Sequence, residues 1–175
     1  MRIAELPREK FEGYQLVFTY DSKAYYDLKI RTTKNVFALE FVRTPCAPIH
    51  KEFEDRLFAP HWDDPHAYGL WDGNQLVAVM EVTPENWNNR LRITNLFVQE
   101  GYRRRGFGTL LMTRAREIAR AQGRRALILE TQSCNSGAIA FYLSQGLTFM
   151  GFNACEYSND DIPNHEVRIE MGCLL

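Results

Sequence analysis

The sequence of 175 residues lacks the features that would direct it to a membrane, to a disulfide-bonded scaffold or to a metal. No apolar run approaches the roughly 20 residues that a membrane-spanning helix needs, and the first residues, MRIAELPREK, lack the apolar core of a secretion signal. The four cysteines are widely spaced and form no C-x-x-C pair, which argues against a zinc site and against a redox pair. We therefore expect a metal-free protein in the cytoplasm.

Lysine is absent after Lys51, so arginine supplies the basic charge in most of the chain. Residues 100–125 hold eight arginines against two glutamates, a net charge of +6, whereas the rest of the chain carries −7. A single basic segment on an acidic protein suits a compact anion better than a long polyanion, which requires a wide basic stripe. Aromatic residues do not alternate with these arginines, so we do not expect nucleic-acid binding.

The composition is 45% apolar and 25% charged, which is ordinary for a globular protein of one domain. Two alternating runs in residues 66–82 surround Asp72-Gly73 and predict a β-hairpin. Other strands are predicted at 12–20, 27–30, 36–42, 90–98, 126–130, 147–157 and 165–171, and helices at 47–58, 107–121 and 136–144. We expect one α+β domain over residues 1–175, built on a central strand–turn–helix–strand–helix unit.

The strand at residues 90–98 is expected to alternate regularly between its two faces. With a period of two residues, Asn95 and Phe97 share the face of Ile93, and Thr94 lies on the opposite face.

The segment GYRRRGFGTL, residues 101–110, lies between a predicted strand and a predicted helix. A helix N-terminus presents unpaired N–H groups and about half a positive charge, and glycine lets the backbone approach an anion. Arg103, Arg104 and Arg105 add charged donors. The segment is a candidate phosphate site, and an ordinary turn with solvated arginines is the alternative. It lacks the lysine of a P-loop and the third glycine of a dinucleotide fingerprint.

The spacing Arg103-x-x-Gly106-x-Gly108 resembles the acyl-coenzyme A loop, [QR]-x-x-G-x-[GA], of the GNAT superfamily of N-acetyltransferases. A second motif of that superfamily, N-x-x-A-x-x-[FL]-Y-x-x-x-G-F, is also matched, except that Leu147 replaces the final phenylalanine. The matching residues are Asn135, Ala138, Phe141, Tyr142 and Gly146. The stretch LETQSCNSGAIAFYLSQGL, with the tail YSNDDIPNHEVRIEM, looks like streptothricin acetyltransferases. This narrower resemblance covers about residues 66–172.

The resemblance implies a mixed, mostly antiparallel central sheet flanked by helices and splayed between its fourth and fifth strands. It also implies acetyl-CoA as co-substrate and transfer of the acetyl group to a primary amine of a small cationic acceptor. For the narrower family, the acceptor is streptothricin and the outcome is antibiotic resistance. No membrane partner is expected, and the sequence leaves open whether the chain forms a homodimer.

Several residues of the candidate site follow from the resemblance. Those expected at acetyl-CoA are Leu96, Phe97, Val98, Arg103, Arg104, Arg105, Gly106, Phe107, Gly108, Thr109, Asn135 and Tyr142. Tyr142 is the expected acid for the departing thiolate, and a core aromatic with a satisfied hydroxyl is the alternative. Asn135 precedes it by two helical turns and can instead be a simple helix cap.

The general base is less clearly indicated, because the sequence has Thr94-Asn95 where many members of the superfamily place a carboxylate. Glu81 is the candidate base, acting directly or through water, and Glu130 is a second candidate. The residues expected to bind the acceptor are Glu81, Asn95 and Glu130. Carboxylates in two loops, Asp160 with Asp161 and Asp63 with Asp64, are candidates to attract a cationic acceptor, and solvated loop charges are the alternative.

Two other functions remain open on the sequence alone. The first is acetylation of protein lysines or N-termini, with the same donor and a different groove. The second is a non-catalytic domain that binds acyl-CoA, which the Thr94-Asn95 position favours and the retained Tyr142 opposes.

Overall fold

The computed structural model describes residues 2–175, which form two compact units. The first unit contains the chain through Phe18, Phe53–Leu129 and Gly172–Leu175, and the second contains Thr19–Glu52 and Glu130–Met171. The elements in chain order are β1 (Arg2–Leu6), α1 (Arg8–Phe11), β2 (Gln15–Thr32), β3 (Phe37–Arg56), β4 (His66–Asp72), β5 (Gln75–Glu85), β6 (Arg90–Val98), the 3-10 helix η1 (Glu100–Tyr102), α2 (Phe107–Ala121), β7 (Ala126–Gln132), α3 (Ser136–Ser144), β8 (Thr148–Asn153) and β9 (Arg168–Leu174). Strands β2, β3, β7 and β9 have residues in both units, so the chain passes between the units within extended structure.

The sheet of the first unit is ordered β1-β4-β5-β6-β7. The pairs β1–β4, β4–β5 and β5–β6 are antiparallel, and β6–β7 is parallel, with a register that runs from Arg90 to Ile93 of β6. Asp72 pairs with Gln75 across a two-residue loop in which Gly73 has a φ of 58°. The predicted hairpin is confirmed, since a two-residue loop of this kind needs a residue with positive φ.

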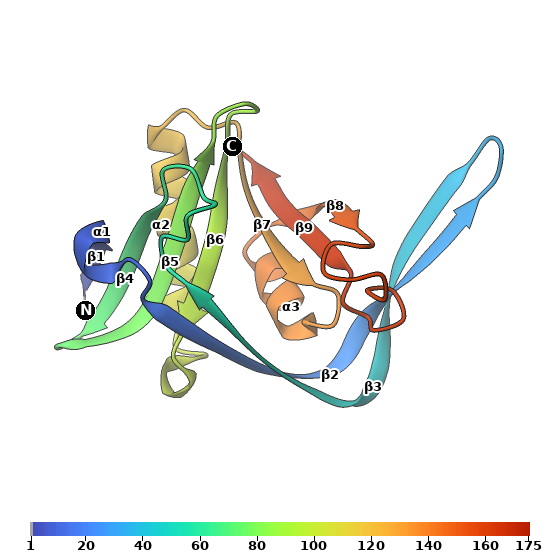
Figure 1. Ribbon diagram of the computed structural model, residues 1–175, viewed down its shortest axis with the longest axis horizontal. Helices are drawn as coiled ribbons and strands as arrows, with labels where there is room; N and C mark the ends of the chain where they lie inside the picture. The colour runs from blue at the N-terminus through green and yellow to red at the C-terminus, as the bar shows by residue number, and fades with distance from the viewer. Residues whose placement is uncertain (1) are drawn as a thin grey trace. The chain divides into compact units, whose positions relative to one another are not determined.

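Two apolar layers cover this sheet. Helix α2 packs against β5 and β6, and its buried residues recur at helical spacing: Phe107, Leu111, Met112, Ala115, Ile118 and Ala119. A second cluster contains Leu6, Leu16, Leu57, Phe58, Ala67, Leu76 and Val79. Figure 1 shows α2 behind the sheet and the segment that joins β3 to β4 in front of it. The predicted helix at residues 107–121 is therefore confirmed, and its buried residues form the face that anchors α2.

A β-bulge at Thr94 changes which side chains of β6 share a face of the sheet, so the regular alternation predicted from the sequence is interrupted. Two consecutive residues of β5 pair with Ile93 and Asn95, so Thr94 is an extra residue between the two pairs. Beyond the bulge, Asn95 and Phe97 lie on the opposite face from Ile93, and Phe97 packs against the second apolar cluster. The prediction that Asn95 and Phe97 share the face of Ile93 was wrong, because one unpaired residue shifts the two-residue alternation of side chains.

The second unit contains the end of β7, followed in the sheet by β9 and β8, together with α3 and most of a two-stranded ribbon of β2 and β3. The predicted helix at residues 136–144 is confirmed as α3. The Phe41 ring of the ribbon lies 5.4 Å from the ring of Phe149 and 5.6 Å from that of Phe152. These contacts pack the inner part of the ribbon against β8.

Residues 47–58 form the end of β3 and the turn after it, so the predicted helix was wrong. Pro45 and Pro48 have no backbone N–H, and each disfavours helical geometry in the residue before it. Extended pairing with β2 satisfies the backbone of this segment instead. The fold class is nevertheless the predicted one, a mixed and mostly antiparallel sheet with α2 and α3 as its longer helices.

Candidate functional site

The arginine–glycine turn joins β6 to α2 in the first unit. After η1 (Glu100–Tyr102) the chain turns, and α2 begins at Phe107. Gly106 caps the helix with a φ of 85°, a left-handed conformation that glycine adopts readily and other residues do not. Arg104 also has a positive φ, of 61°. The backbone therefore turns abruptly into α2, and the first N–H groups of that helix point out of its N-terminus.

The arginines of this turn are held by different contacts. Arg103 Nε donates a hydrogen bond of 3.2 Å to the last carbonyl of β6. The Arg105 guanidinium lies 5.0 Å from the centre of the Tyr102 ring and 5.5 Å from that of Phe107, within the range of cation–π contacts. Arg104 is exposed. The turn is thus an ordered basic surface at a helix N-terminus, which is the arrangement that binds phosphate groups.

The end of β6 leads into this turn. Leu96, Phe97 and Val98 are all partly exposed. The Phe97 ring contacts the Phe18 ring edge-on, with 5.4 Å between the centroids. The Phe97 side chain packs against the second apolar cluster, so the backbone is the part of this residue that a ligand can contact.

Glu81 lies at the centre of a buried hydrogen-bond group on β5, and its exposed fraction is 0%. Its Oε2 accepts from the backbone N–H of Phe58 at 2.6 Å. Its Oε1 accepts from the Thr94 hydroxyl at 2.7 Å and from the Asn95 amide at 3.4 Å. Two consecutive residues of β6 reach the same carboxylate because the bulge at Thr94 interrupts the alternation. Glu81 and Asn95, both expected to bind the acceptor, are therefore hydrogen-bonded to each other inside the core.

Helix α3 of the second unit carries Asn135 and Tyr142. The Asn135 side chain accepts a hydrogen bond of 3.1 Å from the N–H of Ala138, so Asn135 is the N-cap of α3. Tyr142 lies two turns further along α3. Burial raises the pKa of its hydroxyl to about 12. The phenol is therefore protonated throughout the neutral range and can act as a donor.

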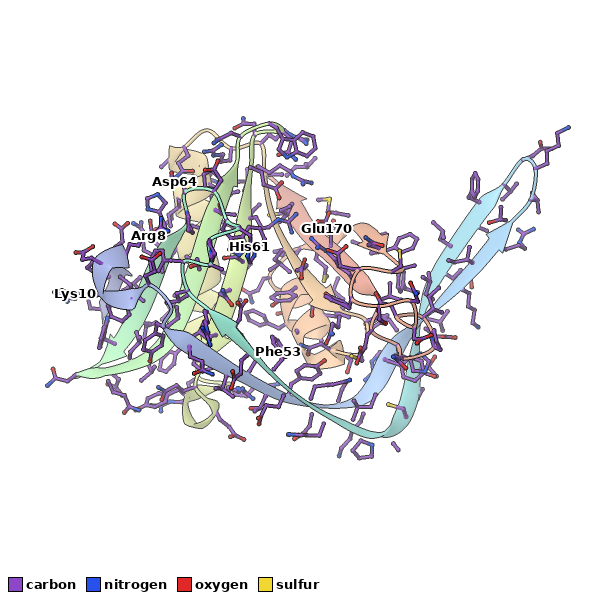
Figure 2. All side chains as sticks on the ribbon, in the orientation of Figure 1. Arg8, Lys10, Phe53, His61, Asp64 and Glu170 are labelled. Carbon is purple, nitrogen blue, oxygen red and sulfur yellow. The ribbon has the colours of Figure 1, made fainter. Side chains whose placement is uncertain are left out.

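Glu130, at the end of β7, belongs to an ionic cluster around Arg168 of β9. The distance between Glu130 Oε2 and Arg168 Nη2 is 2.6 Å, and the Tyr157 hydroxyl donates to Glu130 Oε1 at 3.4 Å. Arg168 also bonds to Glu156, and to Glu170 at 3.3 Å. Figure 2 labels Glu170 on β9. Three carboxylates share one guanidinium, so the cluster has a surplus of negative charge. Arg168 and Tyr157 were not predicted as site residues, and only their spatial proximity reveals them.

Two loops are candidates to attract a cation, and the loop of Asp160 and Asp161 differs from that expectation at Asp161. Asp161 is fully buried and accepts hydrogen bonds from the backbone N–H groups of Tyr157 and Ser158 at 3.0 and 2.8 Å. Desolvation alone would raise its pKa, but these hydrogen bonds hold the pKa of Asp161 below its ordinary value. Asp161 therefore organises its own loop, and it is neither a charge that faces an acceptor nor the solvated loop charge that was the alternative. Asp160 is exposed, and Asp64, labelled in Figure 2, lies 3.5 Å from His66.

The predicted site residues fall into two groups. The first unit holds the turn at 103–109, the end of β6 and the Glu81–Asn95 pair. The second unit holds Glu130, Asn135 and Tyr142. Among residues 2–175, no group of three or more His, Cys, Asp or Glu side chains is arranged to hold a metal ion. Neither α2 nor α3, the longest helices in that range, has the length and apolar character that a membrane crossing requires.

Known proteins similar to this chain are acetyltransferases. A streptothricin acetyltransferase of Streptomyces lavendulae is 33% identical over 103 residues, which are 58% of this chain and 54% of that protein. The chain spans about half the length of the curated relatives it matches. The crystal structure of a nourseothricin acetyltransferase superposes with a TM-score of 0.75 at 22% identity, over 99% of this chain and 97% of that one.

A second solved structure, of a proposed streptothricin acetyltransferase from Bacillus anthracis str. Ames in complex with acetyl coenzyme A, gives a TM-score of 0.74 at 22% identity, over the same shares of the two chains. Both structures support the fold. The family model described as Acetyltransferase (GNAT) family matches residues 33–147, well over half of the sequence. The chain therefore belongs to the GNAT family of acetyltransferases.

Proposed function

We propose that this protein is an acetyl-CoA-dependent N-acetyltransferase whose acceptor is the primary amine of a small cationic molecule, with streptothricin as the first candidate. The observation that carries the proposal is the turn at 103–109, where a left-handed Gly106 caps α2 beside ordered arginines. Membership of the GNAT family and the 33% identity to a streptothricin acetyltransferase support it. We further propose that both units work as one domain and act in the cytoplasm, where the four free thiols would stay reduced.

In this proposal the turn holds the pyrophosphate of acetyl-CoA. The N–H groups at the start of α2 and the guanidinium groups of the turn are the donors, and Gly106 and Gly108 leave room for the phosphates. The backbone of residues 96–98 pairs with the pantetheine arm. Asn135 and Tyr142 are assigned to the same coenzyme near its sulfur.

The chemistry is direct transfer. The amine nitrogen bonds to the acetyl carbon, the carbon–sulfur bond breaks, the nitrogen loses a proton and the sulfur gains one. Tyr142 is the donor to the sulfur. A phenol of pKa about 12 is a weaker acid than a thiol of pKa about 8.5, a difference of about 5 kcal/mol against complete proton transfer. Tyr142 therefore acts best as a hydrogen-bond donor to the developing thiolate, with solvent completing the protonation.

Glu81 is the proposed proton acceptor for the amine. Its carboxylate already accepts three hydrogen bonds, and about four acceptor positions are available on a carboxylate, so one more donor can be accommodated. Because Glu81 is fully buried, a bound water is the natural relay to the amine. The surplus negative charge around Arg168, which includes Glu130, attracts the cationic acceptor.

The test of the coenzyme site is calorimetry with acetyl-CoA on two aspartate variants. Gly106→Asp adds a carboxylate at the helix cap, and we expect at least a tenfold loss of affinity. Gly73→Asp adds the same charge at an exposed hairpin glycine that also has a positive φ and open space around it, and it serves as the matched control. Gly106→Ala separates the strain of the positive φ from the charge. Unchanged affinity in folded Gly106→Asp would remove the pyrophosphate assignment.

The test of the reaction is release of free thiol from acetyl-CoA with streptothricin, with the product identified by mass spectrometry. Related cationic amines and lysine peptides form the comparison set. Acetylated streptothricin supports the narrow proposal, and acetylated peptides alone would support a protein acetyltransferase. Tight acetyl-CoA binding without turnover on any amine would support a non-catalytic binding domain.

A further inference from the structure

Phe53 is the exposed end of an aromatic stack in the first unit. Its ring lies almost parallel to that of Phe18, with 4.9 Å between the centroids and 5° between the planes. The Phe18 ring in turn meets the ring of Phe97 edge-on at 5.4 Å. Phe18 and Phe97 pack against the second apolar cluster, whereas Phe53 is 46% exposed. One face of the Phe53 ring is therefore covered by Phe18, and the other is open to a ligand.

The stack lies on the side of the sheet that carries the proposed base. Beyond the bulge in β6, Asn95 shares a face with Phe97. The Asn95 amide donates to Glu81 at 3.4 Å, and the other oxygen of that carboxylate accepts from the N–H of Phe58, a member of the second apolar cluster. The open ring of Phe53 and the Glu81–Asn95 pair are therefore on the same side of the sheet.

The face of β3 that carries Phe53, which Figure 2 labels, also offers a negative charge. Side chains alternate along a strand, so Asp55 lies on the face of Phe53, and it is partly exposed. Its carboxylate accepts a hydrogen bond of 2.7 Å from the N–H of Arg56 and has room for further donors. Lys51 lies on the same face, but the carboxylate of Glu166 balances its charge. An open aromatic ring beside a carboxylate is suited to binding an organic cation.

The charge of the bound group decides which part of an acceptor suits this position. The reacting amine must lose a proton to form the amide, and a site that stabilises a positive charge opposes that loss. A cationic group that stays charged throughout the reaction gains from the aromatic face without this penalty. The stack therefore suits a second cationic group of the acceptor.

We propose that the stack of Phe53 on Phe18 binds a second cationic group of the acceptor while the reacting amine lies at the Glu81–Asn95 pair, with Asp55 as the counter-charge. The inference rests on the proposed acetyl transfer and specifies its substrate class, namely acceptors with at least two cationic groups. An amine of the same length with an uncharged group in place of the second cation is then a poorer acceptor.

The first experiment measures KM and kcat with streptothricin. Phe53→Leu keeps apolar bulk on Phe18 and removes the aromatic face, so we expect KM for streptothricin to rise by about 3- to 30-fold, with kcat and acetyl-CoA affinity unchanged. Phe53→Trp keeps an aromatic face and should have a KM equal to that of the wild type or lower. Tyr14→Leu, at a 41% exposed tyrosine of the same unit outside the stack, is the matched control and should leave KM unchanged. Circular dichroism establishes that each variant is folded.

The second experiment measures binding of choline by calorimetry. Choline isolates the cation–π contribution, because its quaternary nitrogen has no N–H to donate and cannot be acetylated. We expect the wild-type protein to bind choline more tightly than the uncharged isostere in which carbon replaces that nitrogen. This preference should be lost in Phe53→Leu and kept in Tyr14→Leu.

The outcomes separate the cation site from acetyl transfer. An unchanged KM for streptothricin in Phe53→Leu would overturn the cation site and leave the proposed function standing. Choline binding that depends on Phe53, in a protein that acetylates no amine, would support the cation site and remove the proposed acetyl transfer. Equal binding of choline and its isostere would overturn the cation site, and absence of both choline binding and turnover would overturn both proposals.

Discussion

At the scale of single residues, the carboxylate of Glu81 accepts hydrogen bonds from Phe58, Thr94 and Asn95 in the interior of the first unit. Glutamine has nearly the same size, but its NH₂ group cannot accept, so the donor of Phe58 or Thr94 would lose its partner. We predict that Glu81→Gln lowers the free energy of unfolding by about 1–3 kcal/mol, measured by chemical denaturation.

The proposed role of Glu81 as a base adds a second effect. Turnover per folded Glu81→Gln molecule should fall by about 10² or more. Thr94→Val is the control, because it removes one hydrogen bond and keeps the carboxylate; it should cost about 1 kcal/mol of stability and keep most of the turnover. Equal turnover of the folded Glu81→Gln and wild-type proteins would assign Glu81 a structural role alone.

Tyr142 carries a separate prediction. Tyr142→Phe should lower turnover by about 10² and leave acetyl-CoA affinity nearly unchanged, because the phenol acts in the transition state. With its pKa raised by burial to about 12, the tyrosine keeps its proton as the pH rises through its ordinary value of about 10. The rate should therefore show no decline from loss of this proton between about pH 7 and pH 10. Wild-type turnover in Tyr142→Phe would show that solvent alone supplies the donor.

At the scale of elements, two strand glycines of the first unit offer a matched comparison. A Cβ at Gly172 of β9 would lie 2.6 Å from the backbone oxygen of Leu127, whereas one at Gly69 of β4 would lie 2.6 Å from the end of the Leu76 side chain. A side chain can move and a strand backbone cannot. We predict that Gly172→Ala lowers the free energy of unfolding by about 1–3 kcal/mol and that Gly69→Ala costs less. The reverse order in thermal or denaturant unfolding would contradict this account.

Elements with strong local signals were predictable from the sequence. Helix α2 was predicted at its observed bounds, Phe107–Ala121, because an apolar stripe, a preceding glycine and Gly123 act within the segment itself. The hairpin of β4 and β5 was predicted for the same reason. The end of β3 was not, because its backbone is satisfied by β2, a partner distant in sequence.

At the scale of the whole molecule, the charge distribution makes a prediction about salt. The segment 100–125 carries +6 and the rest of the chain −7, so an anionic coenzyme and a cationic acceptor are attracted to different parts of the protein. Salt screens both attractions, and we expect KM for acetyl-CoA and for the cationic amine each to rise by roughly three- to tenfold between about 0.05 and 0.5 M NaCl. A neutral amine with measurable turnover is the control, since its KM should change little. Constant KM values for both charged substrates would show that long-range charge does not guide binding.

The sequence by itself determined the fold class, the GNAT motifs and the arginine–glycine turn. These depend on residues close together in the chain, whose backbone preferences and spacing act locally: Gly106 adopts its left-handed cap wherever the strand before it lies. Only the tertiary structure decided that Thr94 is a bulge, that Glu81 is buried with Phe58 and Asn95, and that Asp161 faces into its own loop. In each case the decisive hydrogen bond or strand pair joins residues that meet only in the folded chain. The identity of a side chain does not specify which partner it will have.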